Sequence, residues 1–169
     1  MSSPCPTCDA HALATKVENF PYEPTPGFVV LLRGVEIARC KECGTHVPRI
    51  PAIAKLHRAI AAAIVRKRGR LAPPEVRFLR KHLGWAGVDF AAHMGVTPET
   101  VSRWESPKKA SEQIGPQADR LLRVMVQTRE PVSDYSLAEL KSIDRGKATP
   151  LRLGMRIVPS KNTWEPIAA

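Results

Sequence analysis

Hydrophobic residues recur along the chain with two different periods, and this separates a strand-rich N-terminal part from a helix-rich remainder. Phe28–Leu32 is an unbroken apolar run, and Gly34–Arg39 alternates apolar and polar residues up to a cysteine. Both patterns are typical of β-strands, so we expect two strands there. From Pro51 to Arg68 the apolar residues fall three or four positions apart, which predicts one amphipathic helix that ends at Gly69.

A second helical region follows a proline pair and divides into short segments at glycines. Apolar residues on one face predict a helix from Pro74 to Gly84. Glycine suits such an end because it adopts the positive φ of a sharp turn. Another helix is expected from about Ala86, and the residues predicted to face inward are Val88, Phe90, Ala91 and Met94.

The next segment has the signals of a capped helix. Gly95 permits a tight turn, and Thr97 followed by Pro98 supplies an N-cap hydroxyl and a proline in the first turn. Val101 and Trp104 share one face and are expected to pack inward. A helix, a short turn with glycine and a capped helix form the helix-turn-helix arrangement, whose second helix enters the major groove of DNA.

Two more helices and an extended segment are expected towards the C-terminus. Gly115-Pro116 opens a helix that carries Asp119 and Arg123 as an i, i+4 pair. Ser136–Glu139 has the pattern of a capping box, which predicts a helix that ends near Arg145. Alternation over residues 151–158 fits a hairpin, an added strand or a tail that a partner orders.

All four cysteines fall in two C-x-x-C pairs, Cys5/Cys8 and Cys40/Cys43, with 31 residues between the pairs. Each turn lets two thiolates reach one ion, and two turns complete the tetrahedral four-sulfur shell that structural zinc prefers. We therefore expect one Zn²⁺ per chain. Redox use of one pair is the alternative, but it requires a pair on a thioredoxin-like strand-helix unit. The histidines that flank the pairs are expected at the surface, and they are His11 and His46.

These patterns together predict an α+β protein in four parts. A zinc-binding β-sheet domain occupies residues 1–50, and a linking helix occupies residues 51–69. An all-helical DNA-binding domain covers residues 70–146. A C-terminal extension occupies residues 147–169, and a β-hairpin is the candidate structure for it.

The charge balance points to a polyanionic partner. Lysine and arginine total 26 against 16 acidic residues, which gives a net charge of +10. This balance is expected of a protein that binds nucleic acid. Arg66, Lys67 and Arg68 form a basic patch that either contacts phosphates or is an ordinary solvated helix end.

Several classes of protein do not fit the sequence. It has no run of about 18 apolar residues and no signal peptide, so we expect a cytoplasmic protein with no membrane partner. It also has no recognisable Ser/His/Asp set, phosphate loop or paired-carboxylate motif. An enzymatic activity is therefore not expected.

The face of the third helix opposite Val101 and Trp104 is expected to meet DNA. Arg103 could hold guanine O6 and N7 with two parallel hydrogen bonds, while Glu99 could accept a bond from cytosine N4 or simply favour the helix N-terminus. The alternative for Arg103 is an ion pair with Glu99 at i, i+4. The candidate DNA-contacting residues are Thr97, Pro98, Glu99, Ser102, Arg103, Ser106, Lys108, Lys109, Arg66, Lys67 and Arg68.

The segments Leu79–Gly84 and Gly95–Glu105 closely resemble the Xre, or lambda-repressor-like, helix-turn-helix family. With the paired cysteines and Asn19–Tyr22 between them, residues 3–126 resemble the MqsA family of antitoxins and zinc-finger/helix-turn-helix regulators. This resemblance implies a zinc domain that can bind a ribonuclease toxin, and a C-terminal domain that dimerises on palindromic operator DNA.

The expected function is therefore sequence-specific repression by a homodimer on double-stranded DNA, with toxin neutralisation as a further role. One alternative is a stand-alone transcription regulator without a toxin partner. Another is a zinc-ribbon adaptor that binds RNA. A thiol redox enzyme is the third and least supported alternative.

Overall fold

The computed structural model describes residues 4–108, 113–128 and 150–167. In this part of the chain the fold is α+β, with five α-helices and one mixed sheet of five strands. The chain divides into two compact units, which we call the sheet unit and the helical unit. The sheet unit comprises Met1–Tyr22, Val30–Leu56 and Leu153–Ala169, and the helical unit comprises Glu23–Val29 and His57–Arg152.

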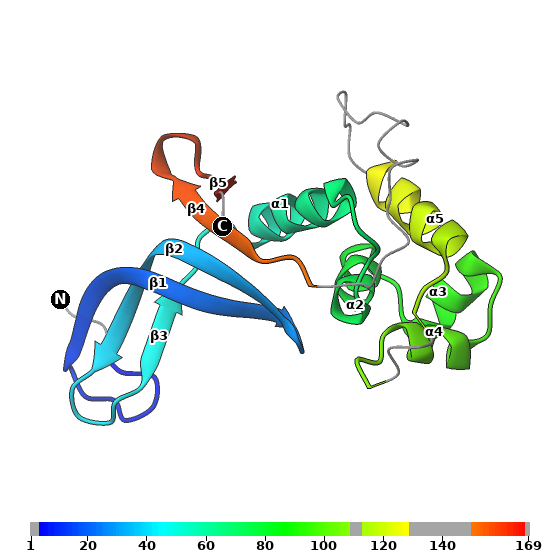
Figure 1. Cartoon of the computed structure of the whole chain (residues 1–169). Coiled ribbons are helices and arrows are strands. Elements are labelled where there is room, and N and C mark those ends of the chain that lie inside the picture. Colours follow the sequence, from blue (N-terminus) through cyan, green and yellow to red (C-terminus); the bar gives the residue numbers. More distant parts are fainter. Residues whose placement is uncertain (1–3, 109–112, 129–149, 168–169) are drawn as a thin grey trace. The chain divides into compact units, whose positions relative to one another are not determined.

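Two long strands, β1 (Leu13–Thr25) and β2 (Phe28–Cys40), form the hairpin on which the sheet is built (Figure 1). A third strand, β3 (His46–Arg49), pairs antiparallel with the C-terminal half of β2 and places Pro48 opposite Ile37. Cys40 is the last residue of β2, and Cys43 lies in the loop between β2 and β3. The hairpin therefore fixes where that loop begins and ends.

The region predicted as two strands is a single strand of 13 residues, so that prediction was wrong. Its buried positions are Phe28, Val30 and Leu32 before Gly34, and Val35 and Ile37 after it. Gly34 has φ +76° and shifts the inward-facing positions by one residue. A sequence pattern cannot separate such a bulge-like shift from a break between two strands.

The strands β1 and β3 were not predicted at all. Among the 13 residues of β1 only Thr25 is buried, so the strand has no alternating apolar face. Pro21 and Pro24 also lie within it, and proline is typical of edge strands and loops. The edge position of β1 explains both features.

The C-terminal residues complete the same sheet. The strand β4 (Leu153–Val158) pairs in parallel with β2 and antiparallel with β5 (Thr163–Ile167). Trp164 on β5 is 3% exposed, and its indole nitrogen donates a hydrogen bond of 3.0 Å to the carbonyl of Pro51. A strand in the segment 151–158 is thus confirmed, and both ends of the chain contribute to one sheet.

The helices begin within two residues of their predicted starts. They are α1 (Ile53–Arg66), α2 (Pro73–His82), α3 (Gly87–Met94), α4 (Pro98–Trp104) and α5 (Pro116–Gln127) (Figure 1). The inward face predicted for α3 is wrong at Val88, which is 62% exposed, and Met94 is only half-buried. Phe90 and Ala91 are buried as predicted.

The core of the helical unit forms where apolar faces of the helices meet the tip of the β1–β2 hairpin. Ile60 and Ile64 on α1 are completely buried. Phe28 at the hairpin tip packs edge-on against Phe78 of α2, with ring centroids 5.8 Å apart. The Thr25 hydroxyl donates a 3.1 Å hydrogen bond to the carbonyl of Pro74. The hairpin tip is therefore an integral part of the helical unit.

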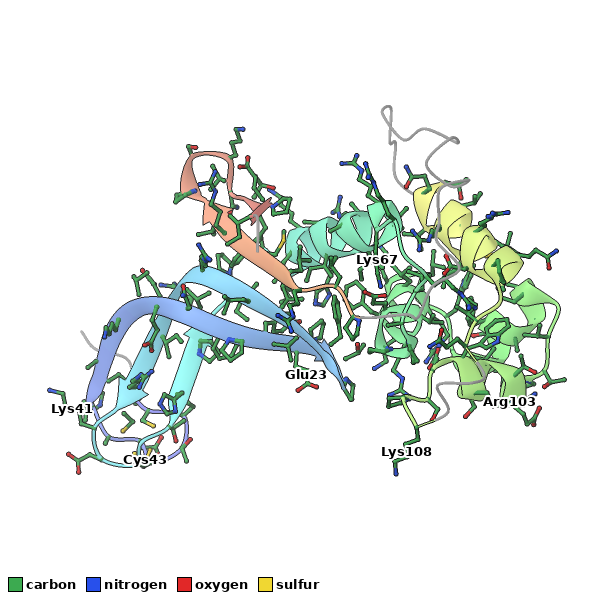
Figure 2. All side chains as sticks on the ribbon, viewed as in Figure 1. Glu23, Lys41, Cys43, Lys67, Arg103 and Lys108 are labelled. Atoms are coloured by element: carbon green, nitrogen blue, oxygen red, sulfur yellow. The ribbon has the colours of Figure 1, made fainter. Side chains whose placement is uncertain are left out.

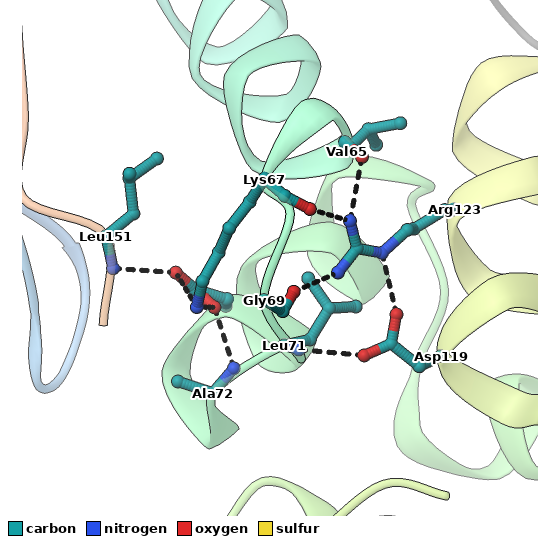
Figure 3. A network of polar contacts seen from close by, with 9 residues as sticks. Val65, Lys67, Gly69, Leu71, Ala72, Asp119, Arg123 and Leu151 are labelled. Carbon is teal, nitrogen blue, oxygen red and sulfur yellow. Dashed lines mark hydrogen bonds and ion pairs between the residues drawn. The ribbon is translucent and has the colours of Figure 1, made fainter. Parts of the chain in front are cut away.

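A buried ion pair on α5 holds the connection between α1 and α2 (Figure 3). Arg123 donates to Asp119 at 2.6 Å, and the two side chains are at most 1% exposed. The guanidinium also donates to three carbonyl oxygens, and the second oxygen of Asp119 accepts the Leu71 amide at 2.7 Å. The three carbonyls belong to Val65, Lys67 and Gly69.

A second buried carboxylate, that of Glu75, lies in the first turn of α2. Glu75 is fully buried and pairs with Lys67 at 2.9 Å. It also accepts hydrogen bonds from the backbone amides of Ala72 at 2.7 Å and Leu151 at 2.9 Å. The segment that leads into β4 is thereby fastened to the N-terminus of α2.

Some sequence predictions lie outside the described residues, namely the helix expected to end near Arg145 and the side chain of Lys109. The domain boundaries expected at residues 50, 69 and 146 stay predictions. Within the described ranges, every helix is too short or too polar to cross a bilayer.

Candidate functional site

The two cysteine pairs lie in turns of the same construction. In the first turn the Cys5 amide donates to Ala10, and the Asp9 amide donates back to Cys5 at 2.9 Å. In the second turn the corresponding bonds run from Cys40 to Thr45 and from Gly44 to Cys40 at 3.0 Å. Asp9 and Gly44 both have positive φ, +57° and +72°. Each turn therefore directs its two thiols towards the same side.

The four sulfur atoms converge on one point. Sγ of Cys5 lies 3.6 Å from Sγ of Cys43, and Sγ of Cys8 lies 3.6 Å from Sγ of Cys40. All four ligand atoms lie within 4.8 Å of one another. A tetrahedral ion with bonds of about 2.3 Å to sulfur separates its ligands by about 3.8 Å. The cluster therefore fits one metal ion, and its sulfur separations are far too long for disulfides, which need about 2 Å.

The thiols of the cluster differ in acidity. Hydrogen bonds with the hydroxyl and the amide of Thr45 lower the pKa of Cys43 to about 6. The Ala10 amide lowers the pKa of Cys8, but hydrogen bonds with the other thiols and loss of hydration outweigh it and raise that pKa to about 12. Thiolate charges at such short separations would repel one another, and a bound cation would balance them. His11 and His46 are exposed, and neither belongs to the metal-binding group that the described residues form.

The second candidate site is the exposed face of α4. Val101 and Trp104 are 2% and 8% exposed, so they face inward as predicted. The candidates Thr97, Pro98, Glu99, Ser102 and Arg103 are exposed, and Ser106 is half-buried. The Thr97 side chain accepts the amide of Thr100 at 3.3 Å and caps the helix.

An ion cluster that the sequence analysis missed holds the C-terminus of α4 on α2. Glu105 is 6% exposed and accepts two hydrogen bonds from Arg80, at 2.5 and 2.9 Å, and one from Arg77 at 3.3 Å. Arg80 also donates to the carbonyl of Trp85 at 2.8 Å. Its hydrogen bonds with Glu105 raise the pKa of Arg80. The cluster fixes α4, so its outer face is presented by a rigid support.

Edge-on packing of Phe90 and Trp104 joins α3 to α4, with ring centroids 6.4 Å apart. The turn between these helices passes through Gly95 in the left-handed region, with φ +64°. Both features fix the angle at which α4 leaves the turn. The exposed residues of α4 therefore share a defined orientation.

The predicted basic residues do not form one surface. Lys67 lies where α1 meets α2, well apart from Arg103 and Lys108 near α4 (Figure 2). The Lys67 side chain is 11% exposed and pairs with Glu75. Arg66, Arg68 and Lys108 are exposed, whereas the Lys67 ammonium is held by the buried Glu75.

The positive charge is concentrated in one of the two units. The helical unit has 18 basic and 11 acidic residues, whereas the sheet unit has 8 basic and 5 acidic residues. Four thiolates and a divalent ion would remove about two further charges from the sheet unit. The helical unit is thus the part whose charge suits a polyanion.

No protein-family model matches the chain, and neither a curated protein nor a solved structure is similar to it at a significant level. Similarity therefore assigns no family to the protein. The cysteine cluster and the exposed face of α4 are the basis for a functional proposal.

Proposed function

We propose that this protein is a sequence-specific DNA-binding transcriptional repressor that inserts α4 into the major groove. The observation that carries the proposal is the exposed face of α4, where Glu99, Ser102 and Arg103 lie opposite the buried Val101 and Trp104. Side chains on such a face can reach base edges, and arginine is well suited to guanine. The Glu105 cluster supplies the rigid support that base recognition requires.

The connection between α3 and α4 supports the same proposal. It is short, passes through Gly95 and leads to a helix capped by Thr97. These are the elements of a helix-turn-helix. The charge of the helical unit favours duplex recognition by this unit over an RNA adaptor built on the sheet unit.

The metal is proposed to be a structural zinc ion held by Cys5, Cys8, Cys40 and Cys43. A shell of four thiolates leaves no coordination position for water, which suits a structural role better than a catalytic one. Thiol redox chemistry is disfavoured because the two pairs face each other at 3.6 Å instead of acting separately. Homodimerisation on a palindromic operator and neutralisation of a ribonuclease toxin are proposed from the resemblance to the MqsA family alone.

Arg103→Ala tests whether α4 reads bases. The variant should bind the preferred duplex more weakly by about 1–3 kcal/mol and lose preference at one base pair per half-site, because a bidentate contact to guanine is removed. The preferred duplex is selected from a random pool with the unchanged protein. Affinities are then measured by fluorescence anisotropy at fixed salt.

Arg120→Ala on α5 is the matched control, since it removes one exposed arginine from the same unit. It should leave the base preference unchanged. If Arg103→Ala keeps the preference and instead lowers the melting temperature, Arg103 serves the fold and the proposed reading face is wrong.

A further inference from the structure

Arg103 belongs to a chain of hydrogen bonds that runs along the exposed face of α4. Its Nη2 atom donates to the hydroxyl oxygen of Thr100 at 3.0 Å. The Thr100 hydroxyl lies 3.2 Å from that of Thr97. Thr97 is in turn hydrogen-bonded to Glu99. Four side chains on one face are therefore connected.

The chemistry of the four groups fixes the direction of this chain. Guanidinium has only donors, so the Thr100 oxygen must accept from Arg103. A bond from its own backbone amide and one from the Thr97 hydroxyl lower the pKa of Glu99, so that carboxylate is ionised near neutral pH and can only accept. Thr97 has one hydroxyl hydrogen and gives it to Glu99. The bond between the threonines must then use the Thr100 hydrogen.

We propose that Thr100 is a positioning residue for DNA recognition, whose hydroxyl orients the Arg103 guanidinium for guanine. This inference rests on the proposed function. Thr100 can do this because two hydrogen bonds to the Thr97 hydroxyl oxygen hold it in place. One comes from the Thr100 hydroxyl, and the other comes from the Thr100 backbone amide at 3.3 Å. Thr100 is also half-buried, unlike its exposed neighbours on this face.

Positioning matters because a free arginine side chain samples many rotamers and must lose that freedom when it binds. The contact with Thr100 uses one guanidinium hydrogen, on Nη2, so this contact does not by itself prevent a two-point contact with a base. Trp104 and Gln113 line a shallow hollow together with Thr100 and Arg103. This hollow gives a base edge room beside the guanidinium.

Thr100→Val tests the inference, because valine keeps the branched shape and replaces the hydroxyl by a methyl group. The readout is the ratio of affinities for the selected duplex and for the duplex changed at the Arg103-dependent base pair. The ratio should fall about threefold to tenfold, the value of one modest hydrogen bond. Thr100→Ser keeps the hydroxyl and should restore the ratio. Melting temperatures show whether either variant changes the fold.

A double-mutant cycle separates positioning from a direct contact. In an Arg103→Ala background, Thr100→Val should have no further effect on the ratio, because it acts only through Arg103. An unchanged ratio in Thr100→Val, or full additivity with Arg103→Ala, would overturn the inference while the proposed function stands. If Arg103→Ala itself leaves every base preference intact, the proposed function fails and the inference with it.

Discussion

Replacing Arg123 by leucine should lower the free energy of unfolding of the helical unit by about 3–5 kcal/mol, as is usual when one partner of a buried ion pair is removed. Asp119 would lose its ionic partner in a site that is 0% exposed. Three backbone carbonyls, in the last turn of α1 and in its connection to α2, would lose their donor as well. Urea unfolding followed by circular dichroism at 222 nm measures the change.

Arg120→Leu on the same helix is the control, because Arg120 is exposed and its loss should change stability by less than about 0.5 kcal/mol. A variant with both Asp119→Leu and Arg123→Leu should recover part of the lost stability, since it no longer buries a lone charge. Equal stability of the Arg123→Leu and Arg120→Leu variants would show that the buried network does not hold the α1–α2 connection.

Removal of the metal should unfold the sheet unit and spare the helical unit. Purified protein should contain about one zinc ion per chain. A strong chelator should remove the stabilisation of the folded state that such an ion supplies to a small domain, which is about 10–16 kcal/mol. Hydrogen exchange resolved by peptide should then accelerate in β1, β2 and β3. The helices α2 to α5 should stay protected because Leu79, Phe90 and Leu122 bury a core of their own.

Cys43→Ser and His46→Ala form a matched pair for this experiment. Cys43 is in the four-sulfur cluster, whereas His46 lies three residues further on and outside it. The serine variant should lose the metal and the alanine variant should retain it. Full metal content in Cys43→Ser, or an unchanged exchange pattern after chelation, would contradict a structural metal.

The helices were predictable because their signals are local. Thr97 and Gly115-Pro116 mark helix starts, and Gly84 and Gly95 end segments with positive φ at +77° and +64°. The cysteine cluster was also predictable, since paired C-x-x-C turns have few other uses. Both kinds of signal lie within a few residues of the feature they specify.

The sheet was harder to predict because its pairing is not local. β4 pairs with a strand more than a hundred residues earlier, and no sequence pattern encodes that partner. At Gly34 the alternation of buried and exposed residues in β2 shifts by one position, which in the sequence looks like a boundary between two strands. Val88 follows the period of α3 but lies beyond the area that neighbouring helices cover, so periodicity alone placed it inside.

The sequence also did not show which charged residues form ion pairs with one another. Lys67 lies in a run of basic residues and was predicted to contact phosphates, but the fold brings it to the buried Glu75. Arg80 and Glu105 are 25 residues apart and meet only because α2 packs against α4. A run of charged residues shows how many charges a segment carries. Packing decides which of these side chains remain available to a partner.

Competition between nucleic acids tests the central proposal most directly. The full-length protein is bound to its selected duplex at fixed salt and challenged with a scrambled duplex and with RNA of the same sequence. DNA reading by α4 predicts that the selected duplex is preferred by about a thousandfold or more, the usual margin of specific over non-specific binding. Equal competition by the scrambled duplex, or a preference for the RNA, would contradict it.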